Sequence, residues 1–199
     1  ALRERGLRAE AVAVDVADPA SARSMVETTL ERHGRIDVLV NNAGLDAPPG
    51  LAWEVDEAHW RRVIDTNLSG QWWCTKAALP HMIERQGGRI VFMSSISARV
   101  GDPDITVAYN AAKAGLIGLT IGLSVHLERY RIRVNAIAPG FTGTTGTPMT
   151  DRQRAEIEAG PFGPMGPGPV ADACLYLARP SGDFVTGTVL NVSAGGWRG

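Results

Sequence analysis

Three side chains between residues 89 and 122 have the types and spacing that proton transfer requires. Tyr109 and Lys113 stand four residues apart in a helical pattern, about one turn, so they share a face; Ser95 follows a short apolar run. A phenol has an unperturbed pKa of about 10, and a cation held close to it lowers that pKa. Tyr109 could then act as a general acid–base while Ser95 hydrogen-bonds the substrate oxygen. Such a Tyr–Lys pair also occurs by chance, so the surrounding sequence has to decide.

Apolar runs alternate with helical segments along the chain. The expected strands are residues 11–16, 36–40, 89–94, 132–138 and 188–192, and the expected helices are 18–33, 56–85, 108–130, 150–159 and 170–178, after a helix tail at 1–10. Strands that are apolar on both faces and alternate with helices indicate a parallel sheet covered on both sides. We therefore predict an α/β fold, a three-layer doubly wound parallel sheet, in a single domain of residues 1–199.

The composition is typical of soluble globular proteins and argues against several other classes. The net charge is −1 and the basic residues are dispersed, which gives no support to nucleic-acid binding. No apolar stretch reaches the length of a membrane span, so no membrane partner is expected. Cys74 and Cys174 are far apart in the sequence, which favours a reducing, cytoplasmic compartment without a disulfide. The His and Cys residues show no metal-ligand spacing, so we expect no metal site.

Small and amide residues follow the second expected strand, as Asn41, Asn42, Ala43 and Gly44. Parallel sheets bind ligands at the carboxyl ends of their strands, but Asn and Gly also favour plain turns, and these residues alone leave both interpretations open. Asn67 falls inside an expected helix, where its modest helix propensity requires a specific reason.

Five of these features occur together in the order of one family. They are Asn-Asn-Ala-Gly at 41–44, Asn67, the serine after the strand at 89–94, Tyr109 with Lys113, and Pro139-Gly140. Over nearly all its length the sequence resembles the short-chain dehydrogenases/reductases, in the group that includes 3-oxoacyl-thioester reductases and sugar-alcohol dehydrogenases. The resemblance implies a Rossmann-like sheet and hydride transfer between NAD or NADP and a secondary alcohol or ketone. It also implies a homotetramer formed through residues 65–85 and 108–130.

The resemblance implies a role for each matching residue. Tyr109 would move the proton, Lys113 would lower its pKa and bind the nicotinamide ribose, Ser95 would orient the substrate, and Asn67 would hold a water in the proton relay. The cofactor contacts would be Asp15 and Val16 for the adenine, Asn42, Ala43 and Gly44 for the adenosine ribose, and Pro139, Gly140 and Thr142 near the carboxamide, with Tyr109 and Lys113.

The choice of Ser95 needs an argument because Ser94 and Ser97 lie beside it. Both Ser95 and Ser97 have a spacing to Tyr109 that the family's serine shows. We choose Ser95 because the string Met-Ser-Ser-Ile matches the family's strand end. Ser97 would then line the substrate pocket, for which Arg99 and Phe141 are further candidates.

The sequence departs from the family in two places. The family's first strand, Gly-rich phosphate-binding turn and second strand, about 50 residues, do not precede residue 1, so we expect a longer gene product. In the family's strand order these two strands would lie between the expected strands 11–16 and 36–40. Without them the backbone groups of those neighbouring strands go unpaired. Dinucleotide binding by the sequence as given would then be weak. The second departure is an insertion at 142–146 in the expected lid, residues 141–168, whose segment 160–169 contains four Gly and four Pro. This composition predicts a mobile lid over an open site.

Two other hypotheses remain beside the oxidoreductase. A non-catalytic binding or regulatory protein could keep the fold with a lost cofactor site. A different reaction, such as dehydration or epimerisation, could use the same scaffold, because fold alone does not fix the chemistry.

Overall fold

The computed structural model describes residues 3–45, 51–142, 150–160 and 162–197 of the 199. Its strands form one parallel sheet in the order β1 (Val38–Asn41), β2 (Gly88–Met93), β3 (Ile132–Pro139) and β4 (Val189–Val192). Residues 90–92 of the central strand β2 are only 0–1% exposed. Burial on both faces explains why this strand reads as a continuous apolar run. The predicted α/β fold with a parallel sheet is confirmed.

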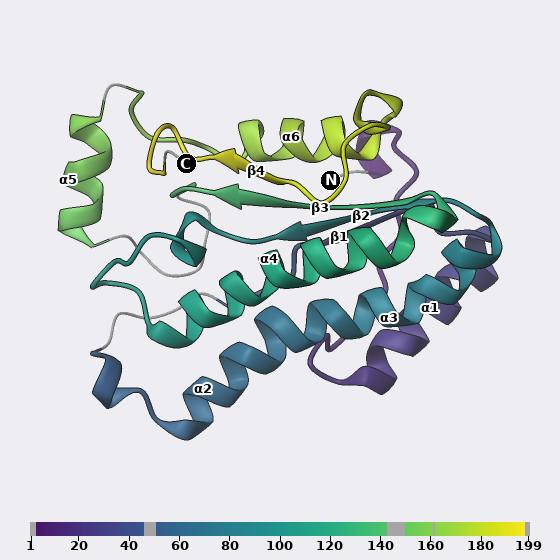
Figure 1. The fold of residues 1–199 in the computed structure, drawn as a ribbon, viewed down its shortest axis with the longest axis horizontal. Coiled ribbons are helices and arrows are strands. Elements are labelled where there is room, and N and C mark those ends of the chain that lie inside the picture. The colour runs from purple at the N-terminus through teal and green to yellow at the C-terminus, as the bar shows by residue number, and fades with distance from the viewer. Residues whose placement is uncertain (1–2, 46–50, 143–149, 161, 198–199) are drawn as a thin grey trace.

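Helices cover both faces of the sheet, which gives the three layers seen in Figure 1. One face carries α3 (Gly70–Glu84) and α4 (Val107–Leu127), with α1 (Pro19–His33) packed against α3. The other face carries α6 (Gly168–Ala178). Each side has its own apolar core, one that includes Met82, Phe92 and Leu116 and another that includes Val91, Ile137 and Leu177.

The ends of α1 follow from its sequence. The Asp18 carboxylate accepts hydrogen bonds from the N–H groups of Ala20 and Ser21, and Pro19 occupies the first helical position. Gly34 ends the helix with φ 70°, a left-handed conformation that glycine adopts without steric cost. The boundaries predicted for this helix are therefore confirmed.

The long helical segment predicted at 56–85 is present but not uniform. It consists of α2 (Glu57–Ile64), a π-helical turn at Asp65–Ser69, and α3. The turn contains Asn67, the residue whose position inside a helix required a reason. π-helical turns are rare and occur often at functional sites.

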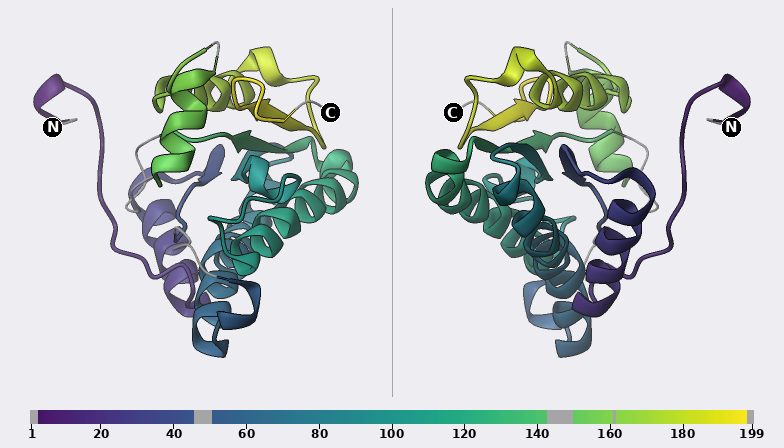
Figure 2. Two further views of the ribbon diagram at one scale, coloured as in Figure 1. Left: turned by 90° about the vertical axis from the view of Figure 1, so that its left-hand side faces the viewer. Right: turned by 90° about the vertical axis from the view of Figure 1, so that its right-hand side faces the viewer.

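The predicted strand at 11–16 is wrong. These residues are extended and mostly exposed, and within the described ranges they form no ladder with another strand. Figure 2 shows this N-terminal segment running away from the sheet. A strand needs a neighbour for its backbone groups, and an apolar pattern cannot report whether one is present. The helix tail expected at 1–10 is a single 3-10 turn, Arg3–Arg5, within its described part.

The segment expected to form the lid contains the predicted short helix, α5 (Asp151–Ala159). Thr150 and Gln153 form a capping box at its start, with each side chain bonded to the other residue's backbone N–H. Most of the insertion predicted at 142–146 lies outside the described residues. Short 3-10 helices complete the description at Ala52–Glu54, Ile96–Ala98, Glu128–Tyr130 and Pro180–Gly182. In the part of the chain described, no helix has the length and apolar character to cross a membrane.

Candidate active site

A cavity of about 620 Å³ opens where β1, β2 and β3 end. The carboxyl ends of parallel strands meet at one edge of a sheet, which is where such folds bind ligands. The sequence-predicted residues that line this cavity are Asn42, Gly44, Ser95, Tyr109, Lys113, Pro139, Gly140 and Thr142. Residues from three strand ends and from α4 are therefore brought to one place.

Tyr109 and Lys113 lie on the first turns of α4 and face this same cavity. The Lys113 Nζ lies 5.3 Å from the centre of the Tyr109 ring. Lys113 is only 4% exposed, and its Nζ donates a hydrogen bond of 2.8 Å to the carbonyl oxygen of Met93 at the end of β2. A buried ammonium group is tolerated only with such partners, so the strand end fixes the amine beside the phenol. The prediction that both groups share one face and one cleft agrees with this geometry.

The structure gives Ser94 and Ser95 different surroundings. The Ser94 hydroxyl is buried and donates to the backbone carbonyl of Lys113 over 2.9 Å, which ties α4 to the end of β2. The Ser95 hydroxyl instead lies 3.1 Å from the Ser97 hydroxyl and accepts from the Ser97 N–H. Both serines line the cavity, but the Ser94 hydroxyl is buried and used within the fold, which favours Ser95 as the residue that contacts a substrate.

Asn67 supports the loop after β1 from behind the cavity. Its side chain is fully buried, with Oδ1 accepting from the Leu45 N–H at 2.6 Å and Nδ2 donating to the Leu45 carbonyl at 2.9 Å. A Cβ atom on Gly44 would lie 3.0 Å from Asn67 Oδ1 and 3.7 Å from Lys113 Nζ. The loop therefore approaches Asn67 so closely that a larger side chain at position 44 would require some displacement, whereas the distance to Lys113 is an ordinary van der Waals contact.

Two polar residues on α3 that the sequence analysis missed also hold the 41–44 turn. Asn41 Nδ2 donates to the Thr75 hydroxyl at 3.0 Å, and Gln71 Nε2 donates to the carbonyl of Ala43 at 3.3 Å. Gln71 and Thr75 are 2% and 0% exposed. Their spacing of four residues was a signal that they share a face of the helix, but it did not indicate what they contact.

Some predicted contacts do not reach this cavity. Asp15 and Val16 lie before α1: the Asp15 N–H donates to the Ser21 hydroxyl, and Val16 packs against Gly70, where an added Cβ would lie 2.9 Å from the Val16 carbonyl oxygen. Ala43 contributes its carbonyl to Gln71, and Ser97 lines a neighbouring cavity instead. The structure therefore brings Ser95, Tyr109 and Lys113 together with the predicted nicotinamide-side residues. Asn67, predicted to hold a water in the relay, does not line this cavity and bonds Leu45 instead, and the residues predicted for the adenine also lie elsewhere.

Helix α6 provides a wall that the sequence analysis did not anticipate, formed by Val170, Ala171 and Cys174. Burial raises the pKa of the Cys174 thiol, so this group stays protonated near neutral pH. Among the residues that the structure describes, no group of His, Cys, Asp or Glu could hold a metal ion.

Comparison with known proteins agrees with this architecture. Residues 1–196 match the family model described as enoyl-(acyl carrier protein) reductase. The crystal structure of a 3-oxoacyl-[acyl-carrier protein] reductase from Brucella melitensis superposes with a TM-score of 0.88 at 34% identity, covering 99% of this chain and 75% of that one. The chain therefore belongs to the short-chain dehydrogenase/reductase family and is an oxidoreductase.

Curated relatives extend the comparison. The chain is 39% identical over 197 residues to the (2S)-[(R)-hydroxy(phenyl)methyl]succinyl-CoA dehydrogenase subunit BbsD of Thauera aromatica, covering 96% of this chain and 77% of the relative. It is also 39% identical over 201 residues to the cis-4-hydroxycyclohexanecarboxylate dehydrogenase of Sinomonas cyclohexanicum, covering 98% and 79%. Both names describe the oxidation of an alcohol on different carbon skeletons.

Proposed function

We propose that the protein transfers a hydride between NAD or NADP and a secondary alcohol or its ketone, with Tyr109 as the general acid–base. The observation that carries the proposal is the cavity that Ser95, Tyr109 and Lys113 line together. The names of relatives that act on alcohols and on 3-oxoacyl groups support the same reaction class.

Each side chain has a defined task in this proposal. Ser95 donates a hydrogen bond to the substrate oxygen and keeps it beside the Tyr109 hydroxyl. Tyr109 gives that oxygen a proton during ketone reduction and removes it during alcohol oxidation. Lys113, anchored on the Met93 carbonyl, places a positive charge near the phenol and favours its ionised form.

The residues present fit the nicotinamide half of the cofactor. Gly44 and Gly140 line the cavity, and a Cβ on Gly140 would lie 3.1 Å from Ser193 Cα, so the end of β3 packs closely on the turn after β4. Lys113 would hold the ribose next to this space, and Thr142 would lie near the carboxamide. When bound, the nicotinamide supplies or accepts the hydride, and the protein supplies orientation and electrostatics.

Titration of NADH and NADPH by their fluorescence, followed by assays on a panel of ketones, tests the proposal. We expect one cofactor to bind and a ketone to be reduced at a rate that depends on Tyr109. A protein that binds neither cofactor would favour the alternative, a binding or regulatory protein on the same fold.

We also propose a homotetramer in a reducing, cytoplasmic environment. The apolar side chains of Ile121 and Val125 on α4 are 53% and 67% exposed, and apolar surface of this kind is typical of protein contacts. Sedimentation equilibrium would measure the assembly, and a monomer at micromolar concentration would refute it.

A further inference from the structure

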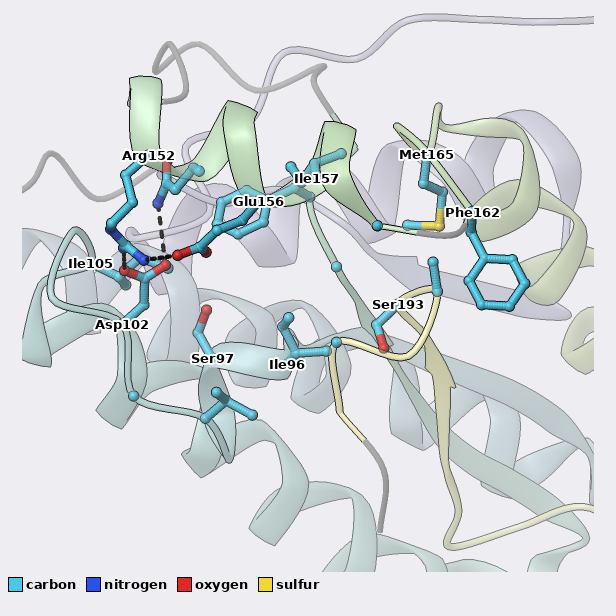
Figure 3. A pocket seen from close by; sticks show the side chains of 18 of the residues that line it. Ile96, Ser97, Asp102, Ile105, Arg152, Glu156, Ile157, Phe162, Met165 and Ser193 are labelled. Carbon is cyan, nitrogen blue, oxygen red and sulfur yellow. Dashed lines mark hydrogen bonds and ion pairs between the residues drawn. The ribbon is translucent and has the colours of Figure 1, made fainter.

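A second cavity of about 300 Å³ adjoins the candidate active site (Figure 3). It lies between α5, the 3-10 helix Ile96–Ala98 and the turn that follows β4. Ser97 lines this cavity and is one hydrogen bond of 3.1 Å from Ser95, while Gly140 lines both cavities. A molecule whose oxygen meets Ser95 and Tyr109 would therefore extend into this space.

The wall of the second cavity is mainly apolar. The apolar side chains that line it include Ile96, Val100, Ile105, Phe141, Ile157 and Phe162. Phe162 is 73% exposed and stands at one end of the cavity beside Met165 in Figure 3. An exposed aromatic ring next to an apolar cavity is typical of a surface that covers a ligand.

The charged side chains of this wall disfavour the binding of an anion. Arg152 is engaged by carboxylates on several sides: it pairs with Asp102, with Asp104 at 2.9 Å and with Glu156 at 2.8 Å. Of the charged residues described in the lining, Asp102 and Glu156 outnumber Arg152. The sequence has no charged side chain between Phe141 and Thr150 that could add a cation. A carboxylate or phosphate placed here would meet excess negative charge, because the guanidinium is already neutralised.

We propose that the substrate is a compact, uncharged ketone or secondary alcohol with an apolar body, and that Asp102 and Glu156 select against substrates that carry an anion on that body. This inference rests on the proposed function for the position of the reacting oxygen. The volume is at the small end of the range for ligand pockets, which favours a single ring or a short chain over a long acyl group.

A matched pair of ketones tests the inference. In para-methylacetophenone and para-acetylbenzoate the same ring carries either a methyl group or a carboxylate. Calorimetric titration of the protein should give a Kd for the neutral ketone at least about tenfold lower than for the anionic one, because one uncompensated charge next to carboxylates costs about this much. Equal or tighter binding of para-acetylbenzoate, or no binding of either ketone, would overturn the inference. Binding of the neutral ketone without turnover under NADH or NADPH would instead overturn the proposed function alone.

A charge reversal on α5 makes the test specific to the wall. Glu156→Arg should reduce the preference for the neutral ketone by about tenfold. Glu158→Arg is the control: it makes the same charge change on an exposed residue of the same helix that does not line the cavity. Each variant places an arginine four residues after an existing one, Arg152 or Arg154, but Glu156→Arg also removes the ion pair with Arg152. Circular dichroism of both variants therefore has to show an unchanged helix content before their preferences are compared. If both variants reduced the preference equally, overall charge would be the cause and the selective role of the wall would be refuted.

Discussion

Helices α4 and α5 border the two cavities, but different forces hold them. Helix α4 is buried against its neighbours: Ala108 and Ala112 pack against Val63 of α2, Leu116 belongs to the main core, and each of the three is 0% exposed. Helix α5 buries Gln153 and is connected to the loop before α4 by polar contacts with Asp102 and Asp104, to which Thr150, Arg152 and Gln153 all donate. Apolar packing makes a helix part of the core, whereas exposed ion pairs contribute little to global stability.

The different anchoring of the two helices matches their proposed roles, proton transfer on α4 and substrate selection on α5. Proton transfer tolerates little displacement, so its groups benefit from a helix that moves only when the domain unfolds. A helix held by polar contacts can open locally at a small cost in free energy, which suits the entry of a substrate. Variants on the two helices should therefore fail in different ways.

The largest effect should come from Tyr109→Phe on α4. Removing the phenol oxygen eliminates the general acid–base, and we expect kcat to fall by about a thousandfold or more while the circular dichroism spectrum stays unchanged. Tyr130→Phe, which removes the same oxygen at the opposite end of this helical segment, is the control and should retain activity. A Tyr109→Phe protein with more than a tenth of the original kcat would refute the assignment.

The next largest effect distinguishes the adjacent serines. Ser95→Ala should lower kcat by roughly a hundredfold without loss of stability, because it removes a hydrogen bond to the substrate oxygen. Ser94→Ala should lower the free energy of unfolding by about 1–2 kcal/mol, because the buried carbonyl of Lys113 loses its donor. Chemical denaturation and steady-state kinetics on both proteins measure the two outcomes. The reverse pattern would transfer the catalytic role to Ser94.

These predictions depend on residues whose type and spacing the sequence already displays. Tyr109 and Lys113 were predicted to share a face because helix geometry is local, and the central strands were found because burial on both faces leaves a continuous apolar run. The strand expected at 11–16 failed for the opposite reason: pairing depends on a neighbour, which is information from elsewhere in the chain.

The contacts made by single polar residues were equally hard to predict. Asn67 was recognised as unusual inside a helix, yet the π-helical turn and its two bonds to Leu45 depend on how a distant loop returns. The pairing of Arg152 with Asp102 joins residues far apart in sequence, and no local pattern predicts it. Sequence therefore located the proposed catalytic residues better than the proposed substrate wall.

A moderate effect is expected from Arg152→Leu on α5. Without the guanidinium, Asp102 and Asp104 lose their shared partner, and α5 should leave the cavity wall more often. We expect KM for a ketone to rise by about threefold to tenfold with kcat within about twofold, because the catalytic groups on α4 do not move. Arg154→Leu, an exposed position on the same helix, should change neither constant. A large fall in kcat for Arg152→Leu would show that the two helices are not independent.

The smallest effect should be a loss of the protection of α5 from hydrogen exchange at low pH. The hydrogen bond from the Thr150 hydroxyl, followed by the contacts with Arg152, lowers the pKa of Asp104. Because the pKa is lower in the folded protein than the unfolded value of about 3.9, this stabilisation is complete above that value and disappears as the pH falls through the folded pKa. Hydrogen exchange corrected for its intrinsic rate should show constant protection of α5 from about pH 5 to 8 and a loss only below about pH 4. Asp104→Asn should weaken this acid-dependent change, while the carboxylates of Asp102 and Glu156 keep their contacts with Arg152. Loss of protection in α4 over the same pH range, before global unfolding, would contradict the proposed difference between the two helices.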